Sequence, residues 1–326
     1  MSEAATIRAS VLLPILAQIE NTGLSVDTLL ARHGILRSQI SDPYAMVSLA
    51  RYVSLFEDAA KLSATPHLGA LLGTKVTPGD LGPTGVLFSI SPTILDAINR
   101  LKLYISAIQR ATSSGLQVVE DNYVWSYQLS SSKLWPRRQD SEFTLSACCQ
   151  LIRLGFSRSW RPIEIHFEHP EPLNPAPLEK IFRAPLKFGQ PSNRLFITRA
   201  DAQRTYRSED SALVAVLEHH IAELAEKQGE PQSLRDRVRS LIGTNLGYGK
   251  ITITTVADDL GLAPRTLQRR LQEDGTSLRE MIEIYRSELA QKQLDAKLKK
   301  VQIADALGYA DSTVFWRARR RWAKDG

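Results

Sequence analysis

Apolar residues recur every three or four positions through most of the first 110 residues, which is typical of helices that pack on one side. The pattern predicts helices at residues 7–20, 25–30, 47–62, 67–72 and 91–110. In the first helix the residues expected to face the core are Ile7, Val11, Leu12, Ile15, Leu16 and Ile19. Ser25 and Ser91 occupy positions where helix caps are preferred. The segment 77–85 is predicted to be a loop, and its glycine spacing matches neither nucleotide-binding fingerprint.

The pattern changes at Gly115, after which apolar and polar residues alternate. Residues 116–119 and 123–129 flank a short polar turn, which predicts a β-hairpin. Further strands are predicted at residues 163–167, 186–189 and 194–197, and helices at residues 141–158 and 178–182. In the helix 141–158 the expected inward residues are Phe143, Leu145, Cys148, Leu151, Ile152 and Leu154. Helices followed by strands indicate an α+β domain, with helices plus a small antiparallel sheet.

A second domain, built only of helices, is predicted near the C-terminus. A helical pattern at residues 209–227 is broken by Gly229-Glu230-Pro231, and another helical pattern follows at residues 233–246. We therefore divide the chain into residues 1–229 and residues 230–326.

One short motif occurs twice in the second domain, at an offset of 47 residues. Residues 256–262 read VADDLGL and residues 303–309 read IADALGY, and a basic helical segment follows each copy. A short helix, a tight turn at glycine and a second helix form a helix-turn-helix, whose second helix fits a DNA major groove. Two tandem copies predict a domain that binds double-stranded DNA.

Residues 278–294 form one continuous helical pattern between the two copies. Its apolar positions are Met281, Ile282, Ile284, Tyr285, Leu289 and Leu294. A helix of this length spans about 25 Å, and successive major grooves on one side of B-DNA lie about 34 Å apart. The sequence thus predicts two helix-turn-helix motifs, joined by a linker helix, that reach neighbouring grooves of one duplex.

The second helix of each motif carries the candidate DNA contacts. In the first, Leu267 and Leu271 are expected to face inward; in the second, Val314 and Phe315 are. Arginine can bind guanine and glutamine can bind adenine through two hydrogen bonds. The predicted DNA-binding residues are Arg265, Thr266, Gln268, Arg269, Arg270, Ser312, Thr313, Trp316, Arg317 and Arg320. Among them Arg270 and Arg320, together with Arg321, are expected to meet phosphates rather than bases.

The distribution of charge supports a polyanionic partner for the second domain. The net charge of the whole chain is +6. Residues 230–326 contain 18 Lys and Arg against 13 Asp and Glu, whereas residues 1–229 contain 23 against 22. Nearly all the excess positive charge therefore accompanies the helix-turn-helix pair.

The run from Ala257 to Leu271 resembles the first DNA-binding motif of the AraC/XylS family of transcriptional regulators. The pattern from Ile303 to Tyr309, followed by Phe315-x-Arg317, resembles the second motif of that family. The resemblance implies that bases are read at the outward positions named above. Arg319 departs from it, because the family usually has a buried Phe there, so either this helix packs differently or Arg319 extends outward. The sequence also ends at Gly326, where the family continues, so we expect a less stable second motif.

The N-terminal part is similar to the effector-type domain of the AraC-family branch that includes ornithine and quorum-sensing regulators. The similarity is carried by Leu81-Gly82-x-x-Gly85, Ser91-Pro92-Thr93, Trp160-x-Pro162 and Phe188-Gly189. It implies a domain that senses a small-molecule effector or forms a homodimer, with RNA polymerase as a candidate partner. The residues that either line an effector pocket or form plain core are Phe88, Tyr104, Tyr123, Trp125 and Tyr127.

Two other function classes remain open for this chain. An architectural DNA-binding protein would need no effector and little sequence preference. An enzyme or metal site in residues 1–229 lacks a recognisable motif, and in His166-Phe167-Glu168-His169 alternation separates His169 from the other two polar residues. We therefore expect no catalytic activity, no cofactor and no metal.

The remaining features favour an intracellular regulator. Cys148 and Cys149 are adjacent in an apolar segment, and we interpret them as buried small residues. The first residues lack the pattern of a signal peptide, and no apolar run approaches the roughly 18 residues of a membrane span. We expect a cytoplasmic protein with no membrane contact.

Overall fold

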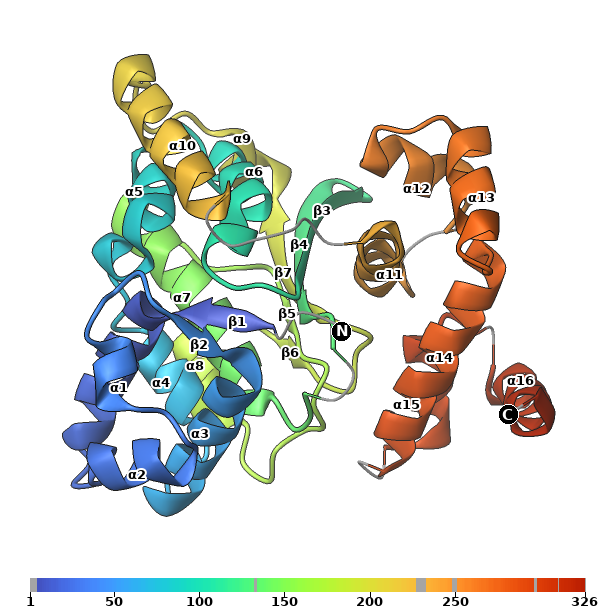
Figure 1. Ribbon diagram of the computed structural model, residues 1–326, viewed down its shortest axis with the longest axis horizontal. Coiled ribbons are helices and arrows are strands. Elements are labelled where there is room, and N and C mark those ends of the chain that lie inside the picture. Colours follow the sequence, from blue (N-terminus) through green and yellow to red (C-terminus); the bar gives the residue numbers. More distant parts are fainter. Residues whose placement is uncertain are drawn as a thin grey trace.

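The computed structural model describes residues 5–131, 134–226, 233–247, 251–295, 298–309 and 311–325. The N-terminal part packs its own core, and the last helices pack a separate one. Figure 1 shows the two parts side by side, with the helices after residue 233 on the right. The predicted domain boundary at residues 229 and 230 lies outside the described residues, so this division remains a prediction.

The first helices form where the apolar spacing predicted them. Their bounds are α1 Ala9–Glu20, α2 Val26–Arg32, α3 Leu49–Leu62 and α4 Leu68–Gly73, with a 3₁₀ turn at Arg37–Ile40. All six apolar residues expected to face inward between residues 7 and 19 are buried. Ser25 caps α2 by accepting a hydrogen bond from the amide of Thr28. Two short strands, β1 Thr6–Arg8 and β2 Met46–Ser48, pair antiparallel just before α1 and α3.

The prediction of a loop over residues 77–85 was wrong in its second half. A 3₁₀ turn at Pro78–Leu81 leads directly into α5, Gly82–Ile90. Gly85 lies within that helix. A larger residue would not fit there, because a Cβ would lie 2.1 Å from the carbonyl oxygen of Pro78. Close backbone packing, rather than a flexible turn, therefore explains a glycine that resembled loop sequence.

The cap predicted for the next helix was also wrong. Ser91 follows α5, and its hydroxyl donates a hydrogen bond to the carbonyl of Leu87. Helix α6, Ile94–Tyr104, is capped by Thr93, which accepts from the amide of Asp96. A 3₁₀ turn at Ile105–Ala107 then leads into the sheet.

A five-stranded sheet has the order β3-β4-β7-β5-β6. The strands are β3 Thr112–Val119, β4 Asn122–Leu129, β5 Ile165–His166, β6 Leu186–Lys187 and β7 Asn193–Thr198. The predicted hairpin is confirmed as β3 and β4, paired from Thr112↔Leu129 to Val119↔Asn122. The predicted small antiparallel sheet is present, and only at its edge do β5 and β6 pair in parallel.

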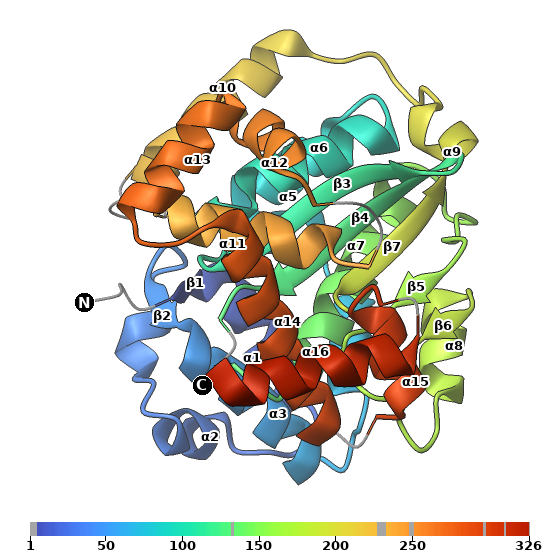
Figure 2. The same ribbon diagram turned by 90° about the vertical axis from the view of Figure 1, so that its right-hand side faces the viewer.

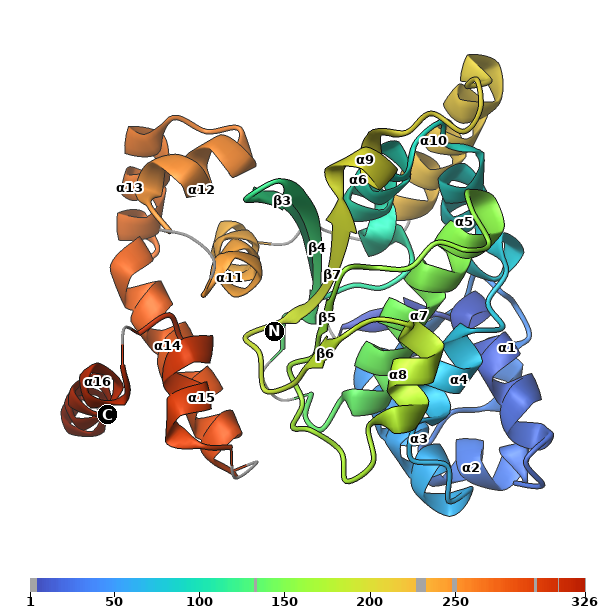
Figure 3. The same cartoon turned by 180° about the vertical axis from the view of Figure 1, so that it is seen from behind.

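One face of the sheet packs on the N-terminal core. Trp125, Tyr127 and Leu129 point to this face and are buried among the helices. Helix α7, Arg138–Gly155, packs against it, with α8 Ala176–Phe182 beside α7 (Figure 3). Leu154, which was expected to face inward, is 49% exposed near the end of α7. Two helices complete the domain, α9 Arg199–Gln203 and α10 Ser211–Glu226.

The opposite face of the sheet is covered by the C-terminal part. Figure 2 shows α11, Leu234–Asn245, running across the strands of the hairpin. The contacts agree, since α11 packs against both β3 and β4. The remaining C-terminal helices are α12 Ile253–Leu260, α13 Pro264–Glu273, α14 Leu278–Asp295, α15 Lys300–Ala306 and α16 Ser312–Asp325.

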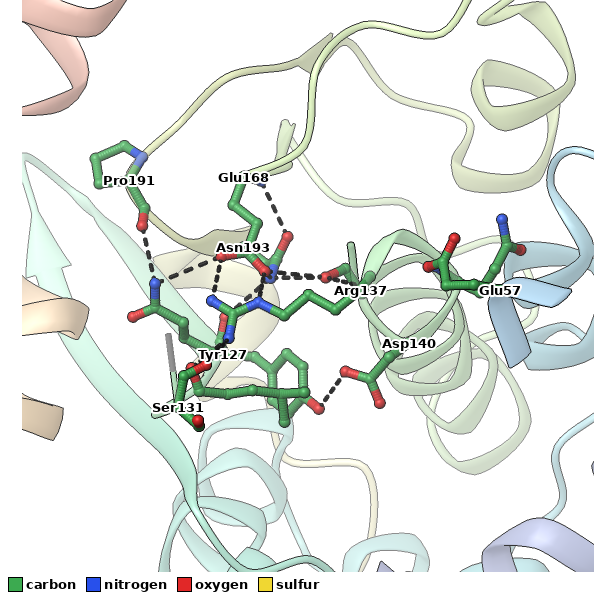
Figure 4. Close-up of polar contacts among 12 residues, drawn as sticks. Glu57, Tyr127, Ser131, Arg137, Asp140, Glu168, Pro191 and Asn193 are labelled. Carbon is green, nitrogen blue, oxygen red and sulfur yellow. Dashed lines mark hydrogen bonds and ion pairs between the residues drawn. The ribbon is translucent and has the colours of Figure 1, made fainter. Parts of the chain in front are cut away.

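A buried polar cluster lies between the sheet and the start of α7 (Figure 4). The guanidinium of Arg137 donates two hydrogen bonds to the carboxylate of Glu168, at 2.6 and 2.7 Å. The amide of Asn193 donates to the same carboxylate at 3.2 Å. In a second contact of the cluster, the hydroxyl of Tyr127 donates to Asp140 at 2.8 Å. Charged groups this deeply buried are retained only when they are paired in this way.

Burial raises the pKa of Asp140 from 3.8 to about 7. The folded protein therefore binds this proton more tightly than the unfolded chain, and stability falls as pH rises between these values. We expect the unfolding free energy to drop by about 2 kcal/mol between roughly pH 5 and 6.5 on this account. Asp140→Asn should remove that pH dependence, measured by urea denaturation at several pH values. Asp121→Asn, at an exposed ion pair, should keep it, and an unchanged slope in Asp140→Asn would contradict the assignment.

Candidate nucleic-acid interface

The first helix-turn-helix is closed by local backbone signals in the sequence. Thr252 caps α12 by accepting from the amide of Thr255 at 3.1 Å. Gly261 ends α12 with φ of 66°, a left-handed conformation that suits glycine. Pro264 then starts α13 at its first turn, where the missing amide hydrogen costs nothing. The predicted turn between the two helices is therefore confirmed in position.

Helix α13 separates its apolar and polar faces cleanly. Leu267 and Leu271 are buried in the C-terminal core, as predicted. The predicted contact residues that are exposed on this helix are Arg265, Gln268, Arg269 and Arg270, while Thr266 is half-buried. Arg269 pairs with Glu273 one turn later at 3.6 Å, with both side chains largely exposed. Such a surface pair contributes little stability, so the guanidinium can exchange it for a base or phosphate.

The second motif has a cap that the sequence reasoning missed. The carboxylate of Asp311 accepts hydrogen bonds from the amides of Thr313 and Val314, at 2.6 and 2.9 Å. These backbone hydrogen bonds lower the pKa of Asp311, which is fully exposed. The signal was present in the sequence, because Asp followed by Ser and Thr is a common helix start.

The inward face of α16 differs in part from the prediction. Phe315 is fully buried, as expected, but Val314 is 38% exposed and points outward. Ala318 is buried one turn after Phe315, in keeping with helical spacing. Among the predicted contact residues, Thr313, Arg317 and Arg320 are exposed, whereas Ser312 and Trp316 are half-buried.

Arg319 extends outward, which resolves the departure noted in the sequence. Its guanidinium lies over the ring of Trp316 at 4.6 Å, and the ammonium of Lys300 lies 5.0 Å from the same ring. The core beside Phe315 is supplied instead by Tyr309 and Trp322, whose rings pack against it. Trp316 was predicted to be an outward base contact; its ring is half-buried and is flanked by these two cations. Lys300 and Arg319 are thus basic residues of this surface that sequence reasoning had not assigned.

The linker helix α14 carries both motifs on one rod. Of its apolar positions, Met281, Tyr285 and Leu289 are buried, whereas Ile284 is 45% exposed. Its Glu283 accepts a hydrogen bond from the indole of Trp322 in α16 at 3.0 Å. Figure 1 shows α16 on the side of α14 away from the N-terminal domain and α13 at the upper end of α14, and Figure 2 gives the view from the right-hand side of Figure 1.

The structure gives less support to an effector pocket around the predicted aromatic residues or to a metal site. Phe88, Trp125 and Tyr127 are fully buried in the core rather than placed around a hollow. One hollow of about 340 Å³ in the N-terminal domain has a largely polar lining that includes Arg161, Asp201 and Arg204. Within the described ranges, no group of three or more His, Cys, Asp or Glu residues is arranged to hold a metal ion. Within the same ranges, no helix is both long and apolar enough to cross a bilayer.

The segment His166 to His169 is part of the buried structure. His166 lies beside Glu164, and burial lowers its pKa to about 4. Glu168 belongs to the ion pair with Arg137, and His169 hydrogen-bonds through Nδ1 to the carbonyl of Pro170. The polar residues of this segment therefore hydrogen-bond or pair with other residues of the folded domain, which is a structural role.

Comparison with known proteins agrees with this architecture. Residues 23–206 match the family model described as the arabinose-binding domain of AraC transcription regulators, and residues 256–325 match a helix-turn-helix domain. The HTH-type transcriptional regulator VirS of Mycobacterium tuberculosis is 26% identical over 284 residues, covering 85% of this chain and 82% of VirS. The ornithine utilization regulator of Pseudomonas aeruginosa is 24% identical over 311 residues, covering 90% of each chain.

Among solved structures, the transcriptional regulator CdpR of Pseudomonas aeruginosa is 20% identical, with a TM-score of 0.45. The match covers 91% of this chain and 93% of that one. The first family match spans more than half of the chain and is followed by the helix-turn-helix match. The chain therefore belongs to the family of AraC transcription regulators and has their N-terminal arabinose-binding type of domain and their C-terminal helix-turn-helix domain.

Proposed function

We propose that this regulator reads one bipartite DNA site, with α13 and α16 in two neighbouring major grooves. The observation that carries the proposal is that two basic, exposed helices, α13 and α16, are joined through a single linker helix, α14. Arg265, Gln268 and Arg269 are proposed to read bases in the first box, with Thr266 beside them. Ser312, Thr313 and Arg317 are proposed to read the second box, while Arg270, Arg320 and Arg321 grip phosphates. Trp316 is proposed to support the second helix, with its flanking cations, rather than to read a base.

We further propose that a small molecule bound to the N-terminal domain controls DNA binding. Support comes from the family match over residues 23–206, whose description names the arabinose-binding domain of AraC transcription regulators. The ornithine utilization regulator is named for a small amino acid, which suggests a polar effector class for this branch. Homodimerisation through the N-terminal domain, contact with RNA polymerase and a cytoplasmic location are proposals of the same kind. An enzymatic role is not proposed, because the relatives are named as regulators.

Selection of binding sites from random duplex DNA tests the bipartite reading directly. The full-length protein is used at fixed, near-physiological salt, because phosphate contacts make affinity steeply dependent on salt. Enrichment of two boxes about one helical turn apart would support reading by both motifs. A single enriched box would mean that α16 only grips the backbone. The absence of any enriched site would favour either a protein that needs its effector to bind DNA or the architectural alternative.

Arg269→Ala should weaken binding to the selected site by roughly 5- to 150-fold, the equivalent of one lost base contact of about 1–3 kcal/mol. Binding to random duplex should change much less, because Arg269 is proposed to contribute base recognition rather than general attraction to phosphates. Both affinities can be measured by fluorescence anisotropy at the same salt concentration.

Arg37→Ala is a suitable control for that measurement. Arg37 is an exposed arginine of the N-terminal domain that pairs with Asp27 at 2.7 Å. It should change neither affinity by more than about twofold, since surface pairs of this kind contribute little. Equal losses on the selected site and on random DNA in Arg269→Ala would instead assign Arg269 to a phosphate.

A further inference from the structure

The sheet face turned toward the DNA-binding part is built mainly of polar and small residues. Cross-strand pairs place Ser113 opposite Gln128 and Gly115 opposite Ser126, and Arg194 of β7 lies beside Ser126. Alternating polar residues usually mark a face in contact with water. Here Ser113, Ser126, Gln128 and Arg194 are all buried.

These polar groups are matched by partners on the DNA-binding part. The guanidinium of Arg194 donates to the carbonyls of Thr244 and Leu246, at 3.1 and 3.0 Å, at the C-terminal end of α11. A cation at this end of a helix satisfies carbonyls that lack partners within the helix and offsets the negative end of its dipole. The hydroxyl of Ser240 in α11 hydrogen-bonds to that of Ser113. The covered face is therefore specifically paired.

A second contact reaches the linker helix itself. The hydroxyl of Tyr285 in α14 donates to the side-chain oxygen of Gln128 at 2.6 Å. The side-chain nitrogen of Gln128 in turn donates to the carbonyl of Pro191 at 3.2 Å. Gln128 is thus hydrogen-bonded within the N-terminal domain, and it also accepts a hydrogen bond from α14, the linker helix between the two motifs.

Glycines at two positions permit this close approach. A Cβ on Gly243 of α11 would lie 2.4 Å from the side-chain oxygen of Gln128 and 2.6 Å from the hydroxyl of Tyr285. A Cβ on Gly115 would lie 3.1 Å from the Cβ of Thr244. Real Cβ atoms essentially never come within 3.0 Å of a heavy atom, so a Cβ on Gly243 would force the side chains of Gln128 and Tyr285 to move from their present contact.

A third contact lies at the far end of α14. The side-chain amide of Gln293 donates to the carbonyl of Gly189 at 3.1 Å, and Gln293 is buried. Gln293 stands two turns after Tyr285 and shortly before the second motif. The N-terminal domain therefore contacts the DNA-binding part at α11, beside the first motif, and again where the rod leads into the second.

We propose that Gln128 and Arg194 are positioning residues for DNA recognition, and that the docked arrangement is the DNA-reading form. The sheet face fixes α11 and the rod, and so sets the spacing between the two recognition helices. In the docked arrangement α13 and α16 lie apart from the sheet of the N-terminal domain (Figure 1), and their basic side chains are largely exposed. The proposal rests on the DNA-reading function proposed above, and goes beyond it by assigning a role to residues that do not touch DNA.

A disulfide between α11 and the sheet tests the proposal on the full-length chain. Ser113→Cys and Ser240→Cys replace two hydroxyls in direct contact, which suits the short Cβ separation a disulfide needs. Cys148 and Cys149 are buried, so they should not compete in the folded protein. On mild oxidation the double variant should form an internal cross-link, seen as a mobility change on a non-reducing gel. Neither single variant should form this internal cross-link, because each carries only one of the two new cysteines.

The cross-linked protein should bind the two-box site within about threefold of the same protein after reduction. Loss of binding by more than about tenfold on oxidation, restored by reduction, would make docking the inhibited form and overturn the proposal. Failure to form the cross-link would show that the docked arrangement is not populated, and would also overturn the proposal. No binding by the reduced protein would contradict the DNA-reading function itself, and the proposal with it.

Gly243→Ala provides a second test that separates positioning from simple unfolding. Alanine favours the helical conformation over glycine, so α11 itself is not weakened. The added methyl should slow cross-linking and weaken binding to the two-box site by at least about fivefold. Binding to the first box alone should change by less than about twofold, because α13 is untouched. Unchanged cross-linking, or equal losses on both sites, would overturn the positioning role.

Discussion

Replacing Arg137 with alanine is expected to lower the free energy of unfolding by about 3–5 kcal/mol, because it strands a buried carboxylate. Arg137 and Glu168 are each only 2% exposed and form a two-pronged hydrogen-bonded pair. Burial alone would raise the pKa of Glu168, but the charge of Arg137 holds it below its ordinary value. A depressed acid pKa gives stability that is present above the unfolded pKa and is lost as pH falls through the folded one. Urea denaturation near neutral pH measures the loss.

Two comparisons make the result specific to the buried pair. Arg199→Ala removes an exposed partner of Asp121 and should lower the unfolding free energy by about 1 kcal/mol or less. The double variant Arg137→Met with Glu168→Met should be less destabilised than Arg137→Ala alone, because no buried charge is left without a partner. An Arg137→Ala loss no larger than that of Arg199→Ala would show that water reaches Glu168.

Phe315→Ala should cost about 3–5 kcal/mol of stability in the C-terminal domain, the usual range for emptying a buried aromatic site. Phe315 is fully buried, and the rings of Tyr309, Trp316 and Trp322 surround it. Its loss should loosen α16, so that binding-site selection recovers the first box while the second fades. Unfolding can be followed through tryptophan fluorescence, since two of these neighbours are tryptophans.

Val314→Ala is the matched control for Phe315→Ala. Val314 is the adjacent residue of the same helix, and its side chain points outward. Its change should stay within about 0.5 kcal/mol, as for most surface substitutions. Similar losses in the two variants would mean that α16 is rotated relative to the described packing.

Elements whose signal is local were predictable from the sequence. The linker helix and the hairpin were placed within a few residues, because their periodicity is set by one buried face. The inward leucines of α13 were also correct, since a short amphipathic helix has only one apolar stripe. For the candidate site, this gave the exposed arginines of the first motif.

Features that depend on distant partners were not predictable in the same way. Helix α5 was missed because its Gly85 resembled a loop residue. Glycine is present there because the backbone of Pro78 packs closely against it, and periodicity does not reveal such a contact. Val314 was placed inward because apolar residues usually are, whereas in the structure Tyr309 and Trp322 pack against Phe315 and Val314 is 38% exposed. The hairpin was predicted without any indication of what covers Ser126 and Gln128, because the covering helix, α11, begins more than 100 residues later in the chain.

The polar character of the docked sheet face has a consequence for how the two halves can part. A joint lined by serine, glutamine, arginine and glycine exposes groups that water can hydrogen-bond as soon as it opens. An interface of leucine and phenylalanine would instead expose an apolar surface on opening, and such a surface promotes aggregation. Opening this interface would therefore leave no large apolar surface in water, and a ligand of the N-terminal domain would shift the balance between docked and open forms by the difference in its affinity for the two.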